Sequence, residues 1–304
     1  MRRVRPLLSP ARRCAVLGSP IAHSLSPALH RAGYAAVGLD WTYDAHDVDE
    51  RALPAFLDGL DSSWRGLSLT MPLKRTVLPL LDDLSPGARR AQVVNTVLLD
   101  AGRRFGDNTD VPGAAAAIRE RYAGPLDRAV ILGGGATAAS ALLALADLGC
   151  SRVVLLVRDP ARAEPTLAVA RRHPDRPVVS VRTLAAPRVD RRADNRVEIS
   201  EPAGAVEQGA GPADILVSTI PAGAQDPAVL ALVDQVPVVF DVVYDPWPTP
   251  LAAHASRLGR TVVSGLDLLV HQAAGQFRLM TGVPDVPLEA MRAAGVAALG
   301  GGTG

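Results

Sequence analysis

The sequence is poor in aromatic residues and in cysteine, and it has no long hydrophobic run. Phe, Trp and Tyr make up 4% of the 304 residues, so a core has to be built mainly from Ala, Val and Leu. The two cysteines, Cys14 and Cys150, lie in apolar surroundings, which favours a reducing compartment over a disulfide framework. No apolar run reaches the roughly 18 residues of a membrane span, and the arginine-rich start lacks the apolar part of a secretory signal. We therefore expect a cytoplasmic protein with no membrane partner.

Lysine is almost absent as well. Basic residues number 32 and acidic residues 31, giving a formal net charge of +1, and this balance argues against a nucleic-acid partner. Lys74 is the single lysine among the 32 basic residues. A lysine can give up its proton near neutral pH whereas an arginine cannot, so Lys74 is a candidate for proton chemistry. Chance survival of one lysine is the alternative that composition leaves open.

The first part of the chain alternates short apolar strands with helices. Ser26-Pro27 is typical of a helix start, with Ser26 as the N-cap. This alternation predicts an α/β unit with a largely parallel sheet. The expected strands are Ala15–Leu17, Trp41–Ala45, Gly66–Leu69 and Thr96–Asp100, and the expected helices are Pro27–Val37, Glu50–Leu60, Thr76–Leu81 and Gly113–Tyr122.

A break at Gly124-Pro125 separates this unit from a second α/β run. We expect a substrate-binding and catalytic domain over residues 1–123, completed by C-terminal helices at about 266–300, and a dinucleotide-binding domain over 124–265. Residues 185–212 lose all periodicity and predict an exposed or partly disordered insertion. The strands expected in the second run are Ala129–Leu132, Val153–Val157, Pro177–Val181, Ile215–Ser218, Val238–Val242 and Thr261–Val263, followed by helices Leu266–Met280 and Leu288–Leu299.

A glycine-rich turn joins the first strand of the second run to an apolar helix. Gly133 permits the tight turn, Gly135 lets the backbone approach a pyrophosphate, and Ala138 allows close packing of helix on strand. The helix N-terminus adds N–H donors and positive potential. This context favours a Rossmann-type, doubly wound domain over an ordinary tight turn. The residues expected to hold the cofactor here are Gly133, Gly134, Gly135, Ala136, Thr137 and Ala138.

The end of the next strand predicts which dinucleotide is bound. A carboxylate would hold a free ribose 2′-hydroxyl, whereas arginines would pair with a 2′-phosphate. Arg158 and Arg162 favour NADP, and Asp159 between them keeps NAD open.

Polar residues gather at the ends of the strands of the first domain, where open α/β sheets bind their ligands. Ser24 and Ser26 precede a helix and could hold a carboxylate, although Ser26 could simply cap the helix. Each of the others could be a turn residue, but together they favour a polyhydroxylated acid as ligand. The full set is Ser24, Ser26, Thr70, Lys74, Asn95 and Asp110.

Several short motifs, in this order and spacing, resemble the shikimate dehydrogenase family over nearly the whole chain. They are Gly18-Ser-Pro-Ile-Ala-His-Ser24-Leu-Ser26-Pro-Ala-Leu-His30, Ser68-Leu-Thr70-Met-Pro72-Leu-Lys74, Val94-Asn95-Thr96, Gly106-Asp-Asn-Thr-Asp110, the glycine loop, Thr219-Ile-Pro-Ala-Gly223, the stretch from Asp241 to Pro250, and the stretch from Gly265 to Phe277. The chain departs from the family pattern at Arg31, Ser68 and Asp159.

The resemblance implies a role for each matching residue. Lys74 and Asp110 would form the catalytic pair, and Ser24 and Ser26 would bind the substrate carboxylate. The ring hydroxyls would be contacted by Thr70, Asn95, Asp110 and Gln272. Tyr244 and Gly265 would line the junction of substrate and nicotinamide, and Thr219 would belong to the cofactor site.

The resemblance implies a reversible, NADPH-dependent reduction of 3-dehydroshikimate to shikimate in aromatic amino-acid biosynthesis. The alternatives are an NAD-using quinate/shikimate dehydrogenase, an enzyme for an amino analogue of shikimate, or a cofactor-sensing homologue without turnover. The six histidines show no paired ligand spacing, so no metal is expected. We expect a monomer or a homodimer.

Overall fold

The chain divides into two compact units. The computed structural model describes residues 11–184 and 212–300. One unit comprises residues 1–120 and 265–304, and the other comprises residues 121–264. The chain therefore passes between the units twice, after Glu120 and after Ser264. The insertion expected at 185–212 lies, except for its last residue, outside the described residues.

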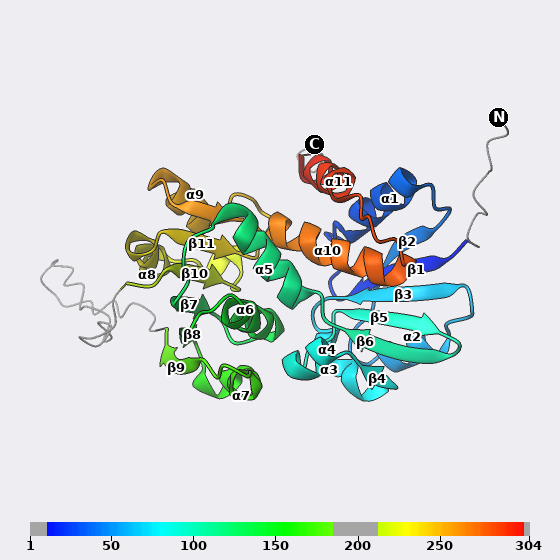
Figure 1. The fold of residues 1–304 in the computed structure, drawn as a ribbon, viewed down its shortest axis with the longest axis horizontal. Helices are drawn as coiled ribbons and strands as arrows, with labels where there is room; N and C mark the ends of the chain where they lie inside the picture. The colour runs from blue at the N-terminus through cyan, green and yellow to red at the C-terminus, as the bar shows by residue number, and fades with distance from the viewer. Residues whose placement is uncertain (1–10, 185–211, 301–304) are drawn as a thin grey trace, which may run out of the picture. The chain divides into compact units, whose positions relative to one another are not determined.

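The first unit is built on a mixed sheet of six strands in the order β2-β1-β3-β5-β6-β4 (Figure 1). The pairs β1–β2, β1–β3 and β4–β6 are parallel, and β5 runs antiparallel to β3 and β6. The strands are β1 (Arg13–Gly18), β2 (Thr42–Asp47), β3 (Trp64–Leu69), β4 (Asp83–Leu84), β5 (Thr96–Asp100) and β6 (Arg103–Asp107).

Helices cover both faces of this sheet. The two C-terminal helices, α10 and α11, lie beside α1 although more than 200 residues separate them in the sequence (Figure 1). The helices of this unit are α1 (Ser26–Val37), α2 (Leu53–Asp58), α3 (Leu73–Thr76), the 3-10 turn η1 (Leu78–Leu80), α4 (Pro86–Ala91), α5 (Asp110–Arg121), α10 (Gly265–Thr281) and α11 (Leu288–Gly300).

Strand β1 shows why the sheet is buried on both sides. Side chains alternate across a strand, so Cys14 and Val16 face one side and Ala15 and Leu17 the other. The first pair packs with side chains of α1, α10 and α11, and the second pair packs with α2 and α3. A strand that is covered on both faces reads as a continuous apolar run, as β1 does in the sequence.

The second unit is a parallel sheet of six strands in the order β12-β11-β10-β7-β8-β9. Counted along this unit, that is the doubly wound 3-2-1-4-5-6 order of dinucleotide-binding folds. Its elements are β7 (Arg128–Leu132), α6 (Ala136–Asp147), β8 (Arg152–Val157), η2 (Pro160–Ala163), α7 (Glu164–Arg172), β9 (Val178–Thr183), β10 (Ile215–Ser218), η3 (Ala222–Ala224), α8 (Pro227–Leu230), η4 (Ala231–Gln235), β11 (Val238–Asp241), α9 (Pro250–Arg257) and β12 (Thr261–Val263). The predicted α/β class with a Rossmann-type second half is confirmed.

The first sheet is less parallel than the sequence predicts. Strand β6, with the sequence Arg-Arg-Phe-Gly-Asp, has no apolar alternation and was not predicted. It forms because Ala101 and Gly102, at φ 47° and 78°, make a tight turn that folds β6 back along β5. Helix α4 was also missed, although Ser85 caps it by accepting the N–H of Ala88.

Several predicted helix starts in the first unit are wrong, including that of the helix expected at Glu50–Leu60, which begins at Leu53. Ser26 is not a cap: helix α1 begins at Ser26 itself, and the hydroxyl of Ser24 accepts the Ser26 N–H at 3.4 Å. Helix α5 begins at Asp110 rather than Gly113, so Asp110 stands in its first turn. The range expected as one helix, Thr76–Leu81, holds the last residue of α3 and the 3-10 turn η1, so Lys74 stands on α3 instead of in a loop.

Two structural findings bear on partners. No helix in the described part of the chain is long and apolar enough to cross a membrane. Within the same residues, no group of three or more His, Cys, Asp and Glu side chains is arranged to hold a metal ion.

Both cysteines are buried thiols, and burial raises the pKa of each to about 11.

Candidate active site

The loops that follow β1 and β3 lie side by side at one edge of the first sheet. Thr70 donates its backbone N–H to the Leu17 carbonyl at 2.9 Å, and Ser19 donates to the Met71 carbonyl at 3.0 Å. Gly18 allows this approach, since a Cβ there would lie 2.3 Å from the Thr70 methyl group. The loop after β1, which carries Ser24 and is called the serine loop, and the loop after β3, which carries Thr70, are therefore held together. They lie at the carboxyl ends of their strands, where the sequence predicts a ligand.

Lys74 and Asp110 form an ion pair at this edge. Lys74 stands on α3, where buried Leu73 anchors the helix, and its Nζ lies 2.6 Å from Oδ2 of Asp110. The side chains are 15% and 6% exposed. Asp110 sits in the first turn of α5, where the helix dipole favours a carboxylate. The pair predicted from the sequence is brought together.

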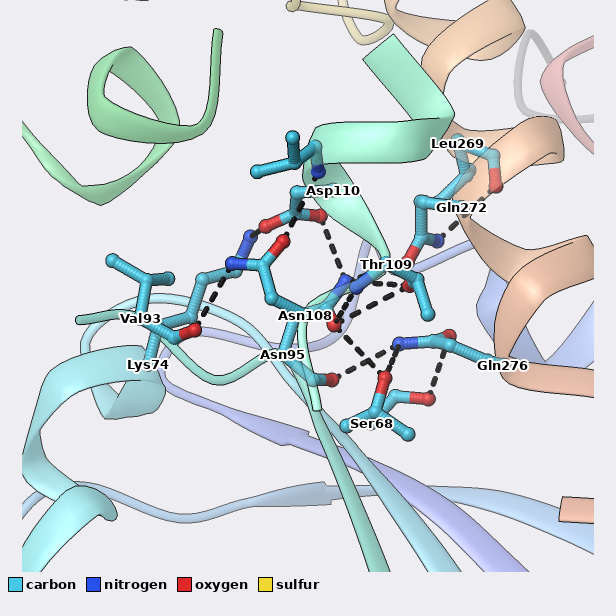
Figure 2. A network of polar contacts seen from close by, with 12 residues as sticks. Ser68, Lys74, Val93, Asn95, Asn108, Thr109, Asp110, Leu269, Gln272 and Gln276 are labelled. Atoms are coloured by element: carbon cyan, nitrogen blue, oxygen red, sulfur yellow. Dashed lines mark hydrogen bonds and ion pairs between the residues drawn. The ribbon is translucent and has the colours of Figure 1, made fainter. Parts of the chain in front are cut away.

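Asn95 is the centre of the polar cluster, as Figure 2 shows. Its Oδ1 accepts the backbone N–H of Thr109 at 2.8 Å, and its Nδ2 donates to Oδ1 of Asp110 at 2.8 Å. A third contact, 3.2 Å long, joins Nδ2 to Oε1 of Gln272 on α10. Asn95 thus holds the second oxygen of the carboxylate that pairs with Lys74.

Gln272 reaches the cluster because α5 and α10 pack closely. A Cβ on Gly113 would lie 2.9 Å from the Cβ and backbone nitrogen of Gln272, so α5 needs a glycine at this contact. The amide of Gln272 also donates to the Leu269 carbonyl at 3.1 Å on its own helix. Gln272 is 8% exposed and lies beside Asn95, and its contact with substrate stays a prediction.

The structure adds polar residues to which the sequence analysis gave no role in the site. Gln276 and Ser68 extend the cluster behind Asn95, and Thr109 joins it from the residue before Asp110 (Figure 2). Gln276 lies one helical turn after Gln272, so the i, i+4 spacing on one helix face was the signal that could have found it. Ser68 lies in β3, and Thr70 follows on the loop after that strand.

Ser26 is joined to this cluster through Tyr43. Ser26 is 5% exposed, and its side chain interacts with the phenol of Tyr43, which donates to Oγ of Ser68 at 2.5 Å. Ser24 and Thr70 are half-buried on the neighbouring loops. All seven residues that the sequence proposed for substrate and catalysis in the first unit therefore occupy one edge of its sheet: Ser24, Ser26, Thr70, Lys74, Asn95, Asp110 and Gln272.

In the second unit, the glycine loop makes a tight turn from β7 into α6. Gly133 has φ 105°, and a Cβ there would lie 2.3 Å from Oγ1 of Thr219, whose hydroxyl donates to the Leu132 carbonyl. Gly135 caps α6 with no side-chain hydrogen bond, and a Cβ on it would meet no atom within 4 Å. Helix α6 therefore begins without a side-chain cap, and the space beside Gly135 is open. Gly134, Ala136, Thr137 and Ala138 complete this turn.

A threonine on α7 that the sequence analysis missed forms a hydrogen bond with the glycine loop. Thr166 on α7 is fully buried, and its hydroxyl donates to the Gly134 carbonyl at 2.9 Å. This hydrogen bond ties the backbone of the glycine loop to α7. Nothing in the pattern around Thr166 distinguished it from any other helix residue.

The residues expected to read the ribose are only partly placed. Arg158 is exposed at the end of β8, and the side chain of Arg162 lies outside the described part of the chain. Asp159 caps η2, with Oδ1 accepting the N–H of Ala161 at 3.0 Å. Asp159 thus has a structural role that accounts for a carboxylate at this point.

Tyr244 lies in the second unit, on the loop after β11, and Gly265 lies in the first unit at the start of α10. Buried Asp241 holds the base of the Tyr244 loop by accepting from Gln225 at 2.8 Å and from Thr249 at 2.6 Å. Burial raises the pKa of this carboxyl group. The roles of Tyr244, Gly265 and Thr219 at the cofactor remain predictions.

Comparison with known proteins identifies the family. Residues 16–97 match the shikimate dehydrogenase substrate binding domain, and residues 265–294 match the shikimate 5'-dehydrogenase C-terminal domain. Shikimate dehydrogenase (NADP(+)) of Moorella thermoacetica is 36% identical over 280 residues, covering 88% of this chain and 87% of its own. This chain belongs to the shikimate dehydrogenase family.

Solved structures of the family agree with the fold. Shikimate dehydrogenase of Mycobacterium tuberculosis is 35% identical with a TM-score of 0.78, and the match covers 94% of this chain and 99% of the other. The shikimate 5-dehydrogenase of Thermus thermophilus, solved in complex with NADP(H) and shikimate, is 34% identical with a TM-score of 0.74 over 95% of this chain and 100% of its own.

Proposed function

We propose that this chain is an NADP-dependent shikimate dehydrogenase, which reversibly reduces 3-dehydroshikimate to shikimate. The observation that carries the proposal is the ion pair of Lys74 with Asp110, set among the amides of Asn95 and Gln272. A polyhydroxylated ring offers the hydroxyl groups that such amides and a carboxylate bind. Curated relatives that are 33–36% identical carry the same activity in their names.

The first unit would bind the substrate. Ser24 and Ser26 supply hydroxyl donors at the start of α1, where the helix N-terminus also favours a carboxylate. Thr70, Asn95, Asp110 and Gln272 supply donors and acceptors for ring hydroxyls. Because Asn95 and Asp110 are 1% and 5% exposed, a hydroxyl bound there replaces little solvent and meets groups that are already oriented.

The proton chemistry falls to Lys74. An ammonium has three N–H donors, and the bond to Asp110 uses one of them. In the reduction, Lys74 would give a proton to the carbonyl oxygen of 3-dehydroshikimate while Asp110 keeps the ammonium oriented. In the reverse direction Lys74 takes that proton back from the hydroxyl. Positioned proton transfer of this kind contributes about 10²–10⁴-fold to a rate.

NADPH would bind at the glycine loop of the second unit and, when bound, supplies the hydride. Residues Gly133–Ala138 offer it a helix N-terminus without a side-chain cap, and Thr166 and Thr219 keep the loop rigid. Arg158 and Arg162 are proposed to pair with the 2′-phosphate. We place the reaction in the cytoplasm, in aromatic amino-acid biosynthesis.

Asp159 is the feature that supports the alternative of an NAD-using quinate/shikimate dehydrogenase. Because Asp159 caps η2, its carboxylate needs no ribose to account for it, and NADP is favoured. Initial rates with shikimate and quinate, each with NADP⁺ and NAD⁺, test the proposal. We expect the highest kcat/KM with shikimate and NADP⁺. A higher value for quinate with NAD⁺ would support the alternative, and no turnover of any pair would support a cofactor-sensing homologue.

A further inference from the structure

A buried chain of hydrogen bonds runs behind the candidate active site. It passes from Tyr43 to Ser68 at 2.5 Å, from Ser68 to Gln276 at 2.8 Å, and from Gln276 to the Asn95 carbonyl at 3.0 Å. Asn95 then donates to Asp110, which holds Lys74. Figure 2 shows the part of this chain from Ser68 onwards. Every member from Tyr43 to Asp110 is at most 5% exposed, so water does not compete for these bonds.

The direction of each bond is fixed by groups that can play only one role. A backbone carbonyl can only accept, so Gln276 must turn its Nε2 towards Asn95 and its Oε1 towards Ser68. The single proton of Ser68 then points at Gln276, and Ser68 must accept from Tyr43. Gln276 Nε2 also lies 3.2 Å from Oγ1 of Thr96, whose hydroxyl donates to Oδ1 of Asn95 at 2.8 Å.

Gln276 therefore acts on Asn95 from two sides. One of its contacts holds the Asn95 backbone, and the other orients Thr96 towards the Asn95 side-chain oxygen. With that oxygen occupied, the Asn95 amide nitrogen faces Asp110. The far end of the chain reaches Ser26, which interacts with the Tyr43 phenol.

His30 packs against Tyr43, at the far end of this chain of hydrogen bonds, and carries no charge there. Its ring stacks on that of Tyr43 with centroids 4.1 Å apart and planes 5° from parallel. Burial lowers the pKa of His30 to about 3, so the imidazole stays neutral at working pH. The phenol of Tyr43 is thus held in place by a flat, uncharged neighbour.

We propose that Gln276 is a positioning residue for the reaction: it fixes Asn95, and through it the Asp110 carboxylate, and links them by Ser68 and Tyr43 to the serine loop. This inference rests on the proposed function. The inference adds to that function a link between the two ends of the proposed substrate site, which both connect to the buried amide of Gln276. Ser26 and Asp110 would thereby keep a fixed distance from each other that suits an acid with a ring.

The first test replaces Gln276 by Met, which has a similar shape but neither donor nor acceptor. We expect kcat for shikimate oxidation to fall about ten- to a hundredfold, since small misplacements of reacting groups cost this much. Shikimate binding, measured by calorimetry without cofactor, should weaken, and the KM for NADP⁺ should stay unchanged. The matched control is Thr281→Val, which removes a hydrogen bond to the Phe277 carbonyl on the same helix and should leave kcat unchanged.

The second test uses Gln276→Glu and varies pH. A protonated Glu offers an O–H donor and a C=O acceptor, one donor fewer than the Gln amide, whereas an ionised Glu has no donor and faces the Asn95 carbonyl. We expect kcat of this variant, divided by that of the unchanged enzyme at the same pH, to rise as pH falls. The same ratio for Gln276→Met should be flat. A merely structural role would give flat ratios for both.

A double-mutant cycle decides whether Tyr43 and Gln276 act as one unit. Tyr43→Phe keeps the stack on His30 and removes the hydroxyl, and its effect on kcat should be less than additive with that of Gln276→Met. Additive effects, or a Gln276→Met enzyme with unchanged kcat, would overturn the inference. If that variant does not fold, the pH ratio of Gln276→Glu decides. Failure of the unchanged enzyme to oxidise shikimate would refute the proposed function instead.

Discussion

Three residues depart from the family pattern, and the structure gives each a local partner. Arg31 donates to the Tyr43 carbonyl and pairs with Asp44 at 2.8 Å, which ties α1 to β2. Ser68 is part of the buried chain behind Asn95. Asp159 caps η2. At the scale of the residue, each of these three side chains makes hydrogen bonds within its own unit.

Arg158 carries the first prediction at this scale. If Arg158 pairs with the 2′-phosphate, Arg158→Ala should raise the KM for NADPH roughly ten- to a hundredfold, because a charge-assisted contact is worth about 1.5–3 kcal/mol. The KM for NADH should change little. Steady-state kinetics with both cofactors measure this. The exposed Arg152→Ala, at the other end of β8, is the control, and equal losses with both cofactors for Arg158→Ala would exclude the 2′-phosphate role.

At the scale of the element, α5, α10 and α11 are joined by one cluster of charges. Arg292 on α11 makes two bonds to Glu120, at 2.9 and 2.8 Å, and one to Asp267 at 2.9 Å, while His271 lies 2.6 Å from Glu120. Glu120 and Asp267 stand next to the two points where the chain passes between the units. The cluster therefore joins the two segments of the first unit close to the points where the chain leaves this unit and returns to it.

This cluster predicts an acid-dependent stability. Partial burial raises the pKa of Glu120, but the bonds from His271 and Arg292 outweigh it, and the net pKa lies below 4.5. The stabilisation is therefore complete above pH 4.5 and is lost as pH falls through the lower, folded-state pKa. Urea unfolding from pH 6 down to about pH 3 should show a falling free energy of unfolding.

Arg292→Met should flatten that fall, because Glu120 would lose two hydrogen bonds and a neighbouring guanidinium charge. The control is Arg171→Met, which breaks an exposed pair with Glu164 on α7. Exposed pairs contribute little to stability, so the control should keep the slope of the unchanged protein. Equal slopes for Arg292→Met and the unchanged protein would show that the cluster does not stabilise the first unit through Glu120.

Apolar pattern explains which elements the sequence could predict. Buried strands such as Ile215–Ser218 and Thr261–Val263 read as short apolar runs and have the predicted bounds. Strand β6 is charged and depends on pairing with β5, so local sequence does not reveal it. Ser26 shows the limit of a start signal: Ser-Pro marks the helix, yet the side chain faces Tyr43 instead of capping.

At the scale of the whole molecule, the proposed function assigns shikimate to the first unit and the cofactor to the second. Ser24→Ala and Ser26→Ala should weaken shikimate binding and leave NADP⁺ binding intact, since both serines belong to the first unit. Neither should cost the roughly 1 kcal/mol of a lost cap, because neither side chain makes the N-cap bond of α1. Calorimetry with each ligand measures this, and unchanged shikimate binding in both variants would place the acid elsewhere.

The polar cluster could be predicted only in part, because some of its contacts join residues that are far apart in the sequence. Lys74, Asn95 and Asp110 lie at strand or helix ends, where sequence position alone suggests a ligand. Gln276 is brought to Asn95 by the return of α10 to the first unit, a contact across 181 residues that no local pattern encodes. Thr166 likewise meets Gly134 only through the packing of α7.

The most direct test of the proposed mechanism is kcat of Lys74→Arg with shikimate and NADP⁺. Arginine keeps the positive charge but cannot release a proton near neutral pH, and its planar group does not fit the place of an ammonium. We predict a fall in kcat of at least about 10², with a much smaller loss of shikimate binding by calorimetry. A Lys74→Arg enzyme that turns over near the rate of the unchanged protein would contradict the acid–base role and leave Asp110 as the candidate.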